Sequence, residues 1–256
     1  MSIELKENEW AKQMVMSKSL GRKPSETLRR VARMYFDSGK SKQEVRRELE
    51  NFLLLCDPKV SIPKWDHTLD IVIKSAQKYD AVDIDYILIT DGEIKQINNL
   101  DGRMIKRLAF TLLCLAKYHI EINPDCDYWV NEKDNEIMSM ANISTSVKRQ
   151  CQLYHQLNDL GMIRFSNKVD NTNVRVNFVD KDENAIIALR VSDFRNLGYQ
   201  YLMYCGEPYF ECENCGLTVK ITDPSNKRRQ KYCKNCAINI KVKQNVESVM
   251  RKRQKS

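Results

Sequence analysis

Four cysteines near the C-terminus carry the clearest chemistry in the sequence. Cys212, Cys215, Cys233 and Cys236 form two Cys-x-x-Cys pairs with the spacing C-x2-C-x17-C-x2-C. Each pair is a short turn that can direct two thiolates at one point, and two pairs supply the four sulfur ligands of a tetrahedral zinc site. The spacing therefore predicts that these residues bind Zn²⁺ in a small zinc ribbon.

A redox-active dithiol is the alternative interpretation of a Cys-x-x-Cys pair. We favour zinc because a thioredoxin-like site needs one pair at a strand-to-helix junction, whereas here two pairs flank a polar segment. The other five cysteines are scattered along the chain. Cys114 and Cys151 lie on apolar faces of expected helices, so we expect them to be small core residues.

Positive charge is concentrated around the four cysteines. The whole chain has a formal net charge of +8. Residues 212–256 contain 12 Lys and Arg against three acidic residues, a net charge of +9, so the 30 Lys and Arg and 31 Asp and Glu of residues 1–211 leave −1. A basic segment of this kind indicates binding to a polyanion.

Two basic clusters lie within this segment, KRRQK at residues 227–231 and RKRQK at residues 251–255. We expect them to contact nucleic-acid phosphates, and a solvated tail that keeps the protein soluble is the alternative. The candidate residues are Lys227, Arg228, Arg229, Lys231, Arg251, Lys252 and Arg253. Only Tyr232 lies beside the basic loop to stack on bases, which favours duplex DNA over RNA.

Residues 1–99 predict a helical N-terminal domain. Apolar residues recur at helical spacing at 25–39, 41–57 and 65–79, and a short strand is expected at 85–90. Ser41 and Glu44 form a capping box, as do Thr90 and Glu93, where a short helix should begin and end near Asn98. Acidic and basic residues alternate along these helices, which is typical of solvated faces.

Residues 100–200 predict a winged helix-turn-helix. The expected order is an apolar helix at 101–119, a strand at Trp129–Val130, helices at 136–141 and 144–160, and a hairpin of strands at 162–166 and 173–179. Ser144 should cap the second of the two short helices, and Gly161 should end it.

The helix at 144–160 should read the major groove. At 3.6 residues per turn, Val147, Cys151, Tyr154 and Leu157 gather on one face, which we expect to pack on the core. The other face and the wing carry hydroxyl, amide and cationic groups that suit base edges and phosphates. The candidate DNA-contacting residues are Thr145, Lys148, Arg149, Gln152, Lys168 and Arg175.

No pattern of an enzyme is found. The sequence offers no Gly-rich phosphate loop, no nucleophile with a base, and no paired acids of the metal-nuclease kind. His67, His119 and His155 lie apart from any cysteine or carboxylate set. No apolar run reaches the roughly 18–20 residues of a membrane span, and the N-terminus has no signal-peptide pattern, so we expect a cytoplasmic protein.

Several segments together resemble a group of uncharacterised proteins of phages and mobile elements of Gram-positive bacteria. They are, in order, RLAFTLLCLAKY, YWVN, ANISTSVKR with LNDLGMI, SDFRNLGYQYLMYCGEPYFECENCG and KYCKNCA. The resemblance covers most of the chain from about residue 41 to residue 237. It implies a phage or integrated-element origin in a bacterial host cell, and a role in replication, transcription control or interference with a host system. Only the cysteine quartet is carried over as a site.

These features predict a mainly α (α+β) protein with four parts: the helical domain at 1–99, the winged helix at 100–200, the zinc ribbon at 201–240 and a basic helical tail at 241–256. We expect it to bind double-stranded DNA. The alternative is a protein-interaction adaptor or inhibitor that binds a host or phage protein. The sequence leaves the target and the oligomeric state open.

Overall fold

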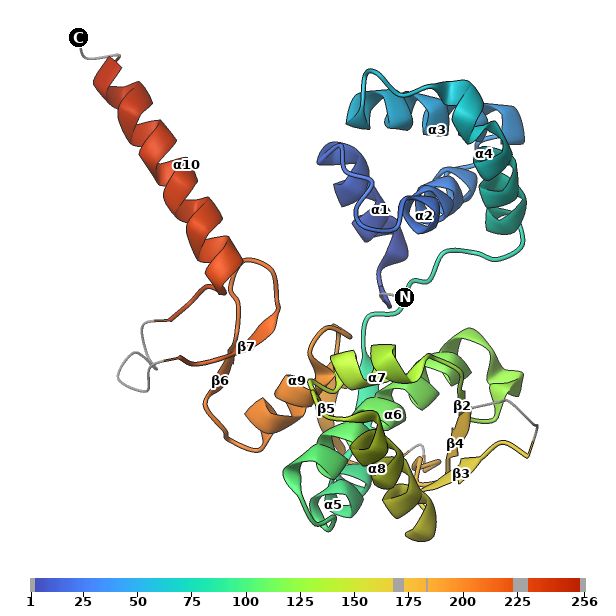
Figure 1. The fold of residues 1–256 in the computed structure, drawn as a ribbon, viewed down its shortest axis with the longest axis vertical. Helices are drawn as coiled ribbons and strands as arrows, with labels where there is room; N and C mark the ends of the chain where they lie inside the picture. The colour runs from blue at the N-terminus through green and yellow to red at the C-terminus, as the bar shows by residue number, and fades with distance from the viewer. Residues whose placement is uncertain (1–2, 168–172, 183, 223–229, 254–256) are drawn as a thin grey trace. The chain divides into compact units, whose positions relative to one another are not determined.

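A computed structural model describes residues 3–167, 173–182, 184–222 and 230–253. In these ranges the protein is a mainly helical α+β structure with ten α-helices and small antiparallel sheets (Figure 1). The chain divides into two compact units, Glu4–Asp85 and Tyr86–Ser256, and the second also includes Met1–Ile3. Each unit is described by itself.

The first unit consists of four helices around one apolar core. They are α1 (Glu7–Met16), α2 (Pro24–Asp37), α3 (Lys42–Cys56) and α4 (Ile62–Ala76). The predicted capping box at the start of α3 is confirmed, because Ser41 Oγ accepts a hydrogen bond from the backbone N–H of Glu44 and the Glu44 carboxylate accepts one from the backbone N–H of Ser41. The core is built from the periodic residues of these helices: Leu28, Val31, Val45, Leu49, Phe52, Leu53, Leu69, Val72, Ile73 and Ala76.

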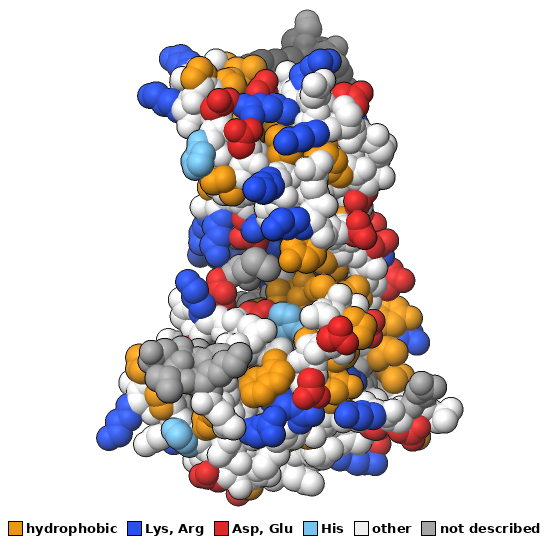
Figure 2. Space-filling model, turned by 90° about the vertical axis from the view of Figure 1, so that its right-hand side faces the viewer, with side chains coloured by type: hydrophobic (Ala, Val, Ile, Leu, Met, Phe, Trp, Pro, Cys, Tyr) orange, Lys and Arg blue, Asp and Glu red, His pale blue; other side chains and the backbone are white. Residues whose placement is uncertain are grey.

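A buried carboxylate ties α1 to α2 in this unit. Glu7 is only 3% exposed, and it forms ion pairs with Arg33 at 2.8 Å and Arg30 at 3.1 Å. On the face drawn in Figure 2, Lys and Arg side chains lie among Asp and Glu side chains.

The second unit begins with a strand whose partner is far away in the sequence. Strand β1 (Ile87–Thr90) pairs antiparallel with β5 (Ile187–Val191), and α5 (Asp91–Asn98) packs on the long apolar helix α6 (Arg103–Ile122). We expected residues up to 99 to belong with the N-terminal helices. The contacts of β1 and α5 join residues 86–98 to the second unit instead, because both pack on elements that follow them.

The carboxylate of Glu93 fixes this part of the unit. The predicted capping box between Thr90 and Glu93 is confirmed. Glu93 is also fully buried, forms an ion pair with Lys117 Nζ at 2.7 Å, and accepts a hydrogen bond from the backbone N–H of Asp180 at 2.9 Å. One acidic side chain therefore joins α5, α6 and the segment after the wing.

The winged helix-turn-helix follows the predicted order. After α6 come η1 (Pro124–Cys126), β2 (Trp129–Val130), α7 (Asp134–Met140), α8 (Val147–Asp159), β3 (Ile163–Phe165) and β4 (Val174–Val176). The three strands form an antiparallel sheet in the order β2-β4-β3. Gly161 ends the region of α8 with a positive φ of 70°, as expected.

Three details of this region correct the sequence analysis. The cap of α8 is Ser146, whose Oγ accepts from the backbone N–H of Arg149, so the helix starts later than Ser144 predicted. Val147 is 73% exposed and Cys151 is also exposed. The buried face of α8 centres on Leu153, Tyr154 and Leu157, which leaves Val147 and Cys151 at its outer edge.

His119 corrects a fourth expectation. Its Nε2 lies 2.9 Å from a carboxylate oxygen of Glu132, so this histidine does have an acidic partner. His119 lies near the end of α6 and Glu132 lies in the segment after β2. Helical spacing in the sequence does not predict a contact between residues of two different elements.

The C-terminal part packs on the winged helix through α9 (Leu197–Tyr204), which is followed by the hairpin of β6 (Tyr209–Glu211) and β7 (Thr218–Lys220) and by α10 (Lys234–Arg253). Gly198 allows α9 to approach the helix-turn-helix closely, because a Cβ there would lie 2.0 Å from the carbonyl oxygen of Ala141. The short strands and α10 form the ribbon that carries the cysteines.

Candidate metal centre and nucleic-acid interface

Two backbone turns present the four cysteines. Cys212 and Cys215 follow β6 in a tight turn, in which the N–H of Gly216 donates to the carbonyl of Cys212 at 2.9 Å. Gly216 has a φ of +70°, which a residue with a Cβ adopts at a cost. Cys233 lies just before α10 and Cys236 lies in its first turn, with the N–H of Ala237 bonded to the carbonyl of Cys233.

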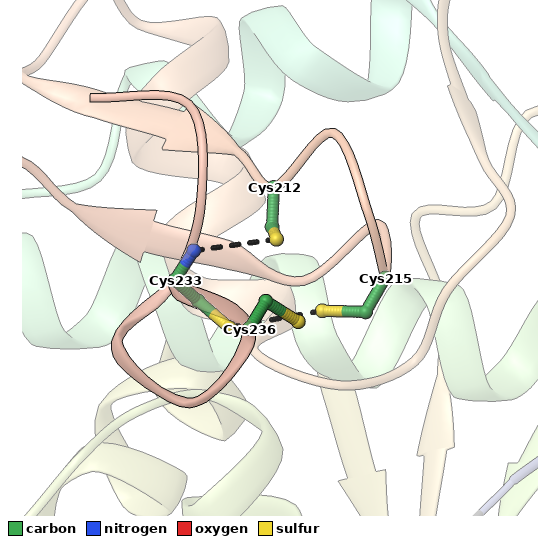
Figure 3. A group of neighbouring side chains, drawn as sticks. All are labelled: Cys212, Cys215, Cys233 and Cys236. Atoms are coloured by element: carbon green, nitrogen blue, oxygen red, sulfur yellow. Dashed lines mark hydrogen bonds between the residues drawn. The ribbon is translucent and has the colours of Figure 1, made fainter. Parts of the chain in front are cut away.

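The four sulfur atoms converge on one point (Figure 3). All four Sγ atoms lie within 4.8 Å of one another, and Sγ of Cys215 lies 3.8 Å from Sγ of Cys233. Zinc–sulfur bonds of about 2.3 Å in a tetrahedron place the sulfurs about 3.8 Å apart. All nine cysteines are free thiols. The predicted quartet is therefore brought together, and its chemistry and spacing fit a bound metal ion such as zinc.

Nitrogen donors surround this sulfur cluster. The backbone N–H of Cys233 donates to Sγ of Cys212 at 3.3 Å, and Nδ2 of Asn214 donates to Sγ of Cys236 at 3.3 Å (the first of these is drawn in Figure 3). Such bonds stabilise thiolates, the form in which cysteine binds a metal. Asn214 was not among the predicted site residues, although its position inside the first Cys-x-x-Cys pair is a signal for such a role.

The pKa values of Cys212 and Cys215 are shifted in opposite directions. Burial raises the pKa of Cys212, but backbone N–H donors, of which that of Cys233 contributes most, outweigh it and lower the pKa to about 6. Burial raises the pKa of Cys215 to about 12. Four clustered thiols cannot all ionise without a nearby positive charge, and a divalent cation would supply that charge.

The ribbon has a small core, and the cluster at its centre consists of ligands. Cys212, Cys233 and Cys236 are buried there, with Cys215, Val219 and Tyr232 packed against them. In the hairpin region, Tyr209, Thr218 and Ile221 are buried as well. A core of this size does not offset the conformational entropy of ordering the segment. The metal would therefore be the main stabiliser of the ribbon.

The candidate DNA-contacting residues of α8 gather at its N-terminal half. Lys148 and Gln152 are exposed, and Arg149 donates from Nη1 to the side-chain oxygen of Gln152 at 3.1 Å. Thr145 is partly buried, and its backbone carbonyl accepts from Gln150 Nε2. The exposed Lys148 and Gln152, together with the half-buried Arg149, thus form a polar and cationic face of α8.

Arg175 has a structural partner. Its guanidinium donates to both carboxylate oxygens of Asp127, at 2.7 and 2.8 Å, and this bond lowers the pKa of Asp127. Across the sheet, Arg175 lies opposite both Trp129 and Arg164. The exposed Arg164, with its guanidinium 5.7 Å from the centre of the Trp129 ring, is a cation that the sequence analysis missed, although the period-2 pattern of β3 places it on the outer face.

The basic clusters are only partly within view. Lys168, Lys227, Arg228 and Arg229 lie outside the described residues, as do the side chains of Lys252 and Arg253. Lys231 lies 3.3 Å from Glu213, and Arg251 lies 3.8 Å from Glu247 in α10. Both are exposed ion pairs, which salt screens and which a phosphate can replace.

Comparison with known proteins adds no relative. No protein-family model, curated protein or solved structure matches this chain significantly. Among the helices of the described residues, none is long and apolar enough to cross a membrane.

Proposed function

We propose that this protein binds double-stranded DNA, with the winged helix orienting it on the duplex and the zinc ribbon and basic tail holding phosphates. The proposal depends mainly on the polar face of α8 in a helix-turn-helix, where Lys148, Arg149 and Gln152 lie together. In helix-turn-helix proteins the equivalent helix enters the major groove. Cationic and amide groups on that helix suit phosphates and base edges.

The concentration of charge in the ribbon supports the second contact. Residues 212–256 carry a net charge of +9, and α10 alone has six Lys and Arg against one Glu. Zinc would fold the ribbon and hold the start of α10, since Cys236 belongs to both. The four-cysteine site is in this proposal a structural zinc site rather than a catalytic one, because all four ligand positions are protein thiolates.

Hydrogen bonds connect the two proposed contact surfaces. Asn142, in the turn between α7 and α8, donates from Nδ2 to Asn196 Oδ1 at 2.9 Å. Asn196 in turn donates from Nδ2 to the carbonyl of Thr218 in β7 at 2.9 Å. Two surfaces joined in this way can bind one duplex cooperatively. In keeping with the resemblance to phage and mobile-element proteins, we propose a role in replication or transcription control.

The test is an anisotropy titration of the zinc-loaded protein on random-sequence duplex DNA at about 50 and about 200 mM salt. Lys148→Glu with Arg149→Glu should weaken binding about tenfold or more and reduce the salt slope by about 1.8, or about 0.9 per lost phosphate contact. The matched control is Lys74→Glu with Lys78→Glu, in the other unit, which should leave affinity within about twofold.

A chain ending at Glu211 separates the contribution of the ribbon from that of α8. Loss of salt-sensitive binding in this variant would support the phosphate clamp. No binding by the full chain at low salt would reject DNA binding altogether and favour the alternative of a protein-interaction adaptor or inhibitor. The exposed apolar residues of α10 are the observation that keeps this alternative open.

A further inference from the structure

Helix α10 exposes a stripe of aliphatic side chains. This apolar stripe consists of Ile238, Val242, Val246 and Met250, which are 52%, 55%, 48% and 59% exposed. The residues recur every four positions and so cover roughly 120° of the helix circumference. Single exposed aliphatic residues are common, but a row of them along one helix marks an interaction surface.

No described helix or strand of its own unit packs extensively against α10. In Figure 1, α10 extends from the ribbon, and the other described helices of the unit gather around α6. Most helical stability in proteins comes from burying an apolar face. The stripe is mostly β-branched, and such residues are weak helix formers. A partner that covers it would therefore stabilise α10.

A recess adjoins the stripe at the zinc end of the helix. It has a volume of about 290 Å³ and is lined by Asn214, Asn239, Ile240, Val242 and Lys243. Val242 belongs to both the stripe and the recess. Asn214 comes from the first cysteine turn, and its bond to Cys236 holds that turn against α10. The recess thus depends on the folded zinc site.

The charges beside the stripe decide what kind of partner fits. On a helical projection, Lys234 and Lys241 border one edge of the stripe and Lys243 borders the other. Glu247 is the only acidic residue of the helix. A second copy of α10 would place like charges opposite one another. A lipid surface would favour Trp, Phe and Leu, and the stripe has none.

We propose that the apolar stripe and its adjoining recess form a docking surface for an acidic amphipathic helix of a partner protein. The partner's apolar face would cover Val242 and Val246, and its flanking carboxylates would meet the lysines at the two edges. This goes beyond the proposed DNA binding, since it uses the apolar side of α10. It can fail or succeed independently of that function.

The probe is a labelled synthetic peptide of about four heptads, with Leu at positions a and d and Glu at e and g. Its binding to the full-length zinc-loaded protein is followed by fluorescence anisotropy. Val242→Asp with Val246→Asp should weaken binding at least about tenfold. The matched control is Gln244→Asp with Ser248→Asp, which adds the same charge on the opposite side of α10 and should change affinity less than about threefold. Circular dichroism and a zinc assay confirm that each variant keeps the helix and the metal.

Four results would overturn the proposal. The first is no saturable peptide binding by the wild-type chain, and the second is an equal loss in both double variants, which would mean attraction by net charge alone. The third is a dimer in sedimentation that only the Val242 and Val246 variant dissociates, which would make a second copy the occupant. The fourth is stripe-dependent binding to vesicles of anionic lipid in place of the peptide. Titration of duplex DNA with the Val242→Asp, Val246→Asp variant measures the proposed DNA binding separately.

Discussion

The side-chain amide of Asn214 donates a hydrogen bond to the sulfur of Cys236 across 3.3 Å. Asn214 lies between the two cysteines of the first pair, and Cys236 lies in the first turn of α10. A neutral side chain therefore joins the two halves of the sulfur cluster without being a ligand. It also stabilises the thiolate of Cys236, as groups around metal ligands commonly do.

Replacing this amide should weaken metal binding. Asn214→Ala should reduce zinc affinity about tenfold or more, since loss of a partner of a metal ligand typically has this effect. Competition with a chromophoric chelator measures the affinity. Asn235→Ala is the matched control because Asn235 is exposed within the second pair. Equal affinities of the two variants would show that the bond to Cys236 contributes nothing.

Removing zinc should unfold the ribbon but spare the winged helix. The central cluster of the ribbon consists mainly of the ligands, whereas the winged helix is built on the buried residues of α6. Chelation should lower the far-UV helical signal by the share of α10. In a Trp10→Phe, Trp65→Phe chain, Trp129 reports on the winged helix alone, and its emission should stay unchanged. A shifted Trp129 spectrum on chelation would mean that the winged helix depends on the metal.

Glu93 should be a critical residue for stability. Glu93→Gln should cost the Tyr86–Ser256 unit about 3 kcal/mol, because it leaves the amino group of Lys117 without its buried counter-charge. Urea unfolding followed by Trp129 emission, in the same tryptophan background, gives the value. Glu121→Gln removes an exposed carboxylate near the end of α6 and should change little. A similar midpoint for both variants would refute the structural role of the ion pair.

Gly198 should not tolerate a side chain. Gly198→Ala should destabilise the same unit by about 3 kcal/mol, because the added Cβ would overlap the carbonyl oxygen of Ala141 and push α9 from the helix-turn-helix. Gly161→Ala provides the contrast. Gly161 has a φ of +70° and open space around it, so its substitution should cost only about 1 kcal/mol of backbone strain. If Gly198→Ala costs no more, α9 can shift without loss.

Local patterns in the sequence predicted local structure well. The two capping boxes and the cysteine quartet depend on residues a fixed distance apart in a turn or helix, and each is present. The order of helices and strands in the winged helix could be predicted for the same reason. Cys114 is buried in α6 as its apolar face indicated, and burial raises the pKa of its thiol.

Contacts between distant segments were not readable. Strand β5 pairs with a strand about one hundred residues earlier, and no spacing rule connects Val191 to Ile87. Arg175 was predicted to contact DNA from the wing, but its guanidinium binds Asp127, which precedes β2 in the sequence. Val147 is the first residue of α8 and is exposed, which helical periodicity alone does not predict.

The contacts of Asn196 have one more consequence. They join the turn before α8 to the hairpin of the ribbon, two parts with different structures. A single chain that binds a duplex through both would be asymmetric along the DNA. Its footprint would be lopsided, protecting more base pairs on one side of its recognition site, and inverting the site would turn the whole protein around. Such a protein would distinguish the two directions along the DNA, which a two-fold symmetric dimer of DNA-binding domains cannot do.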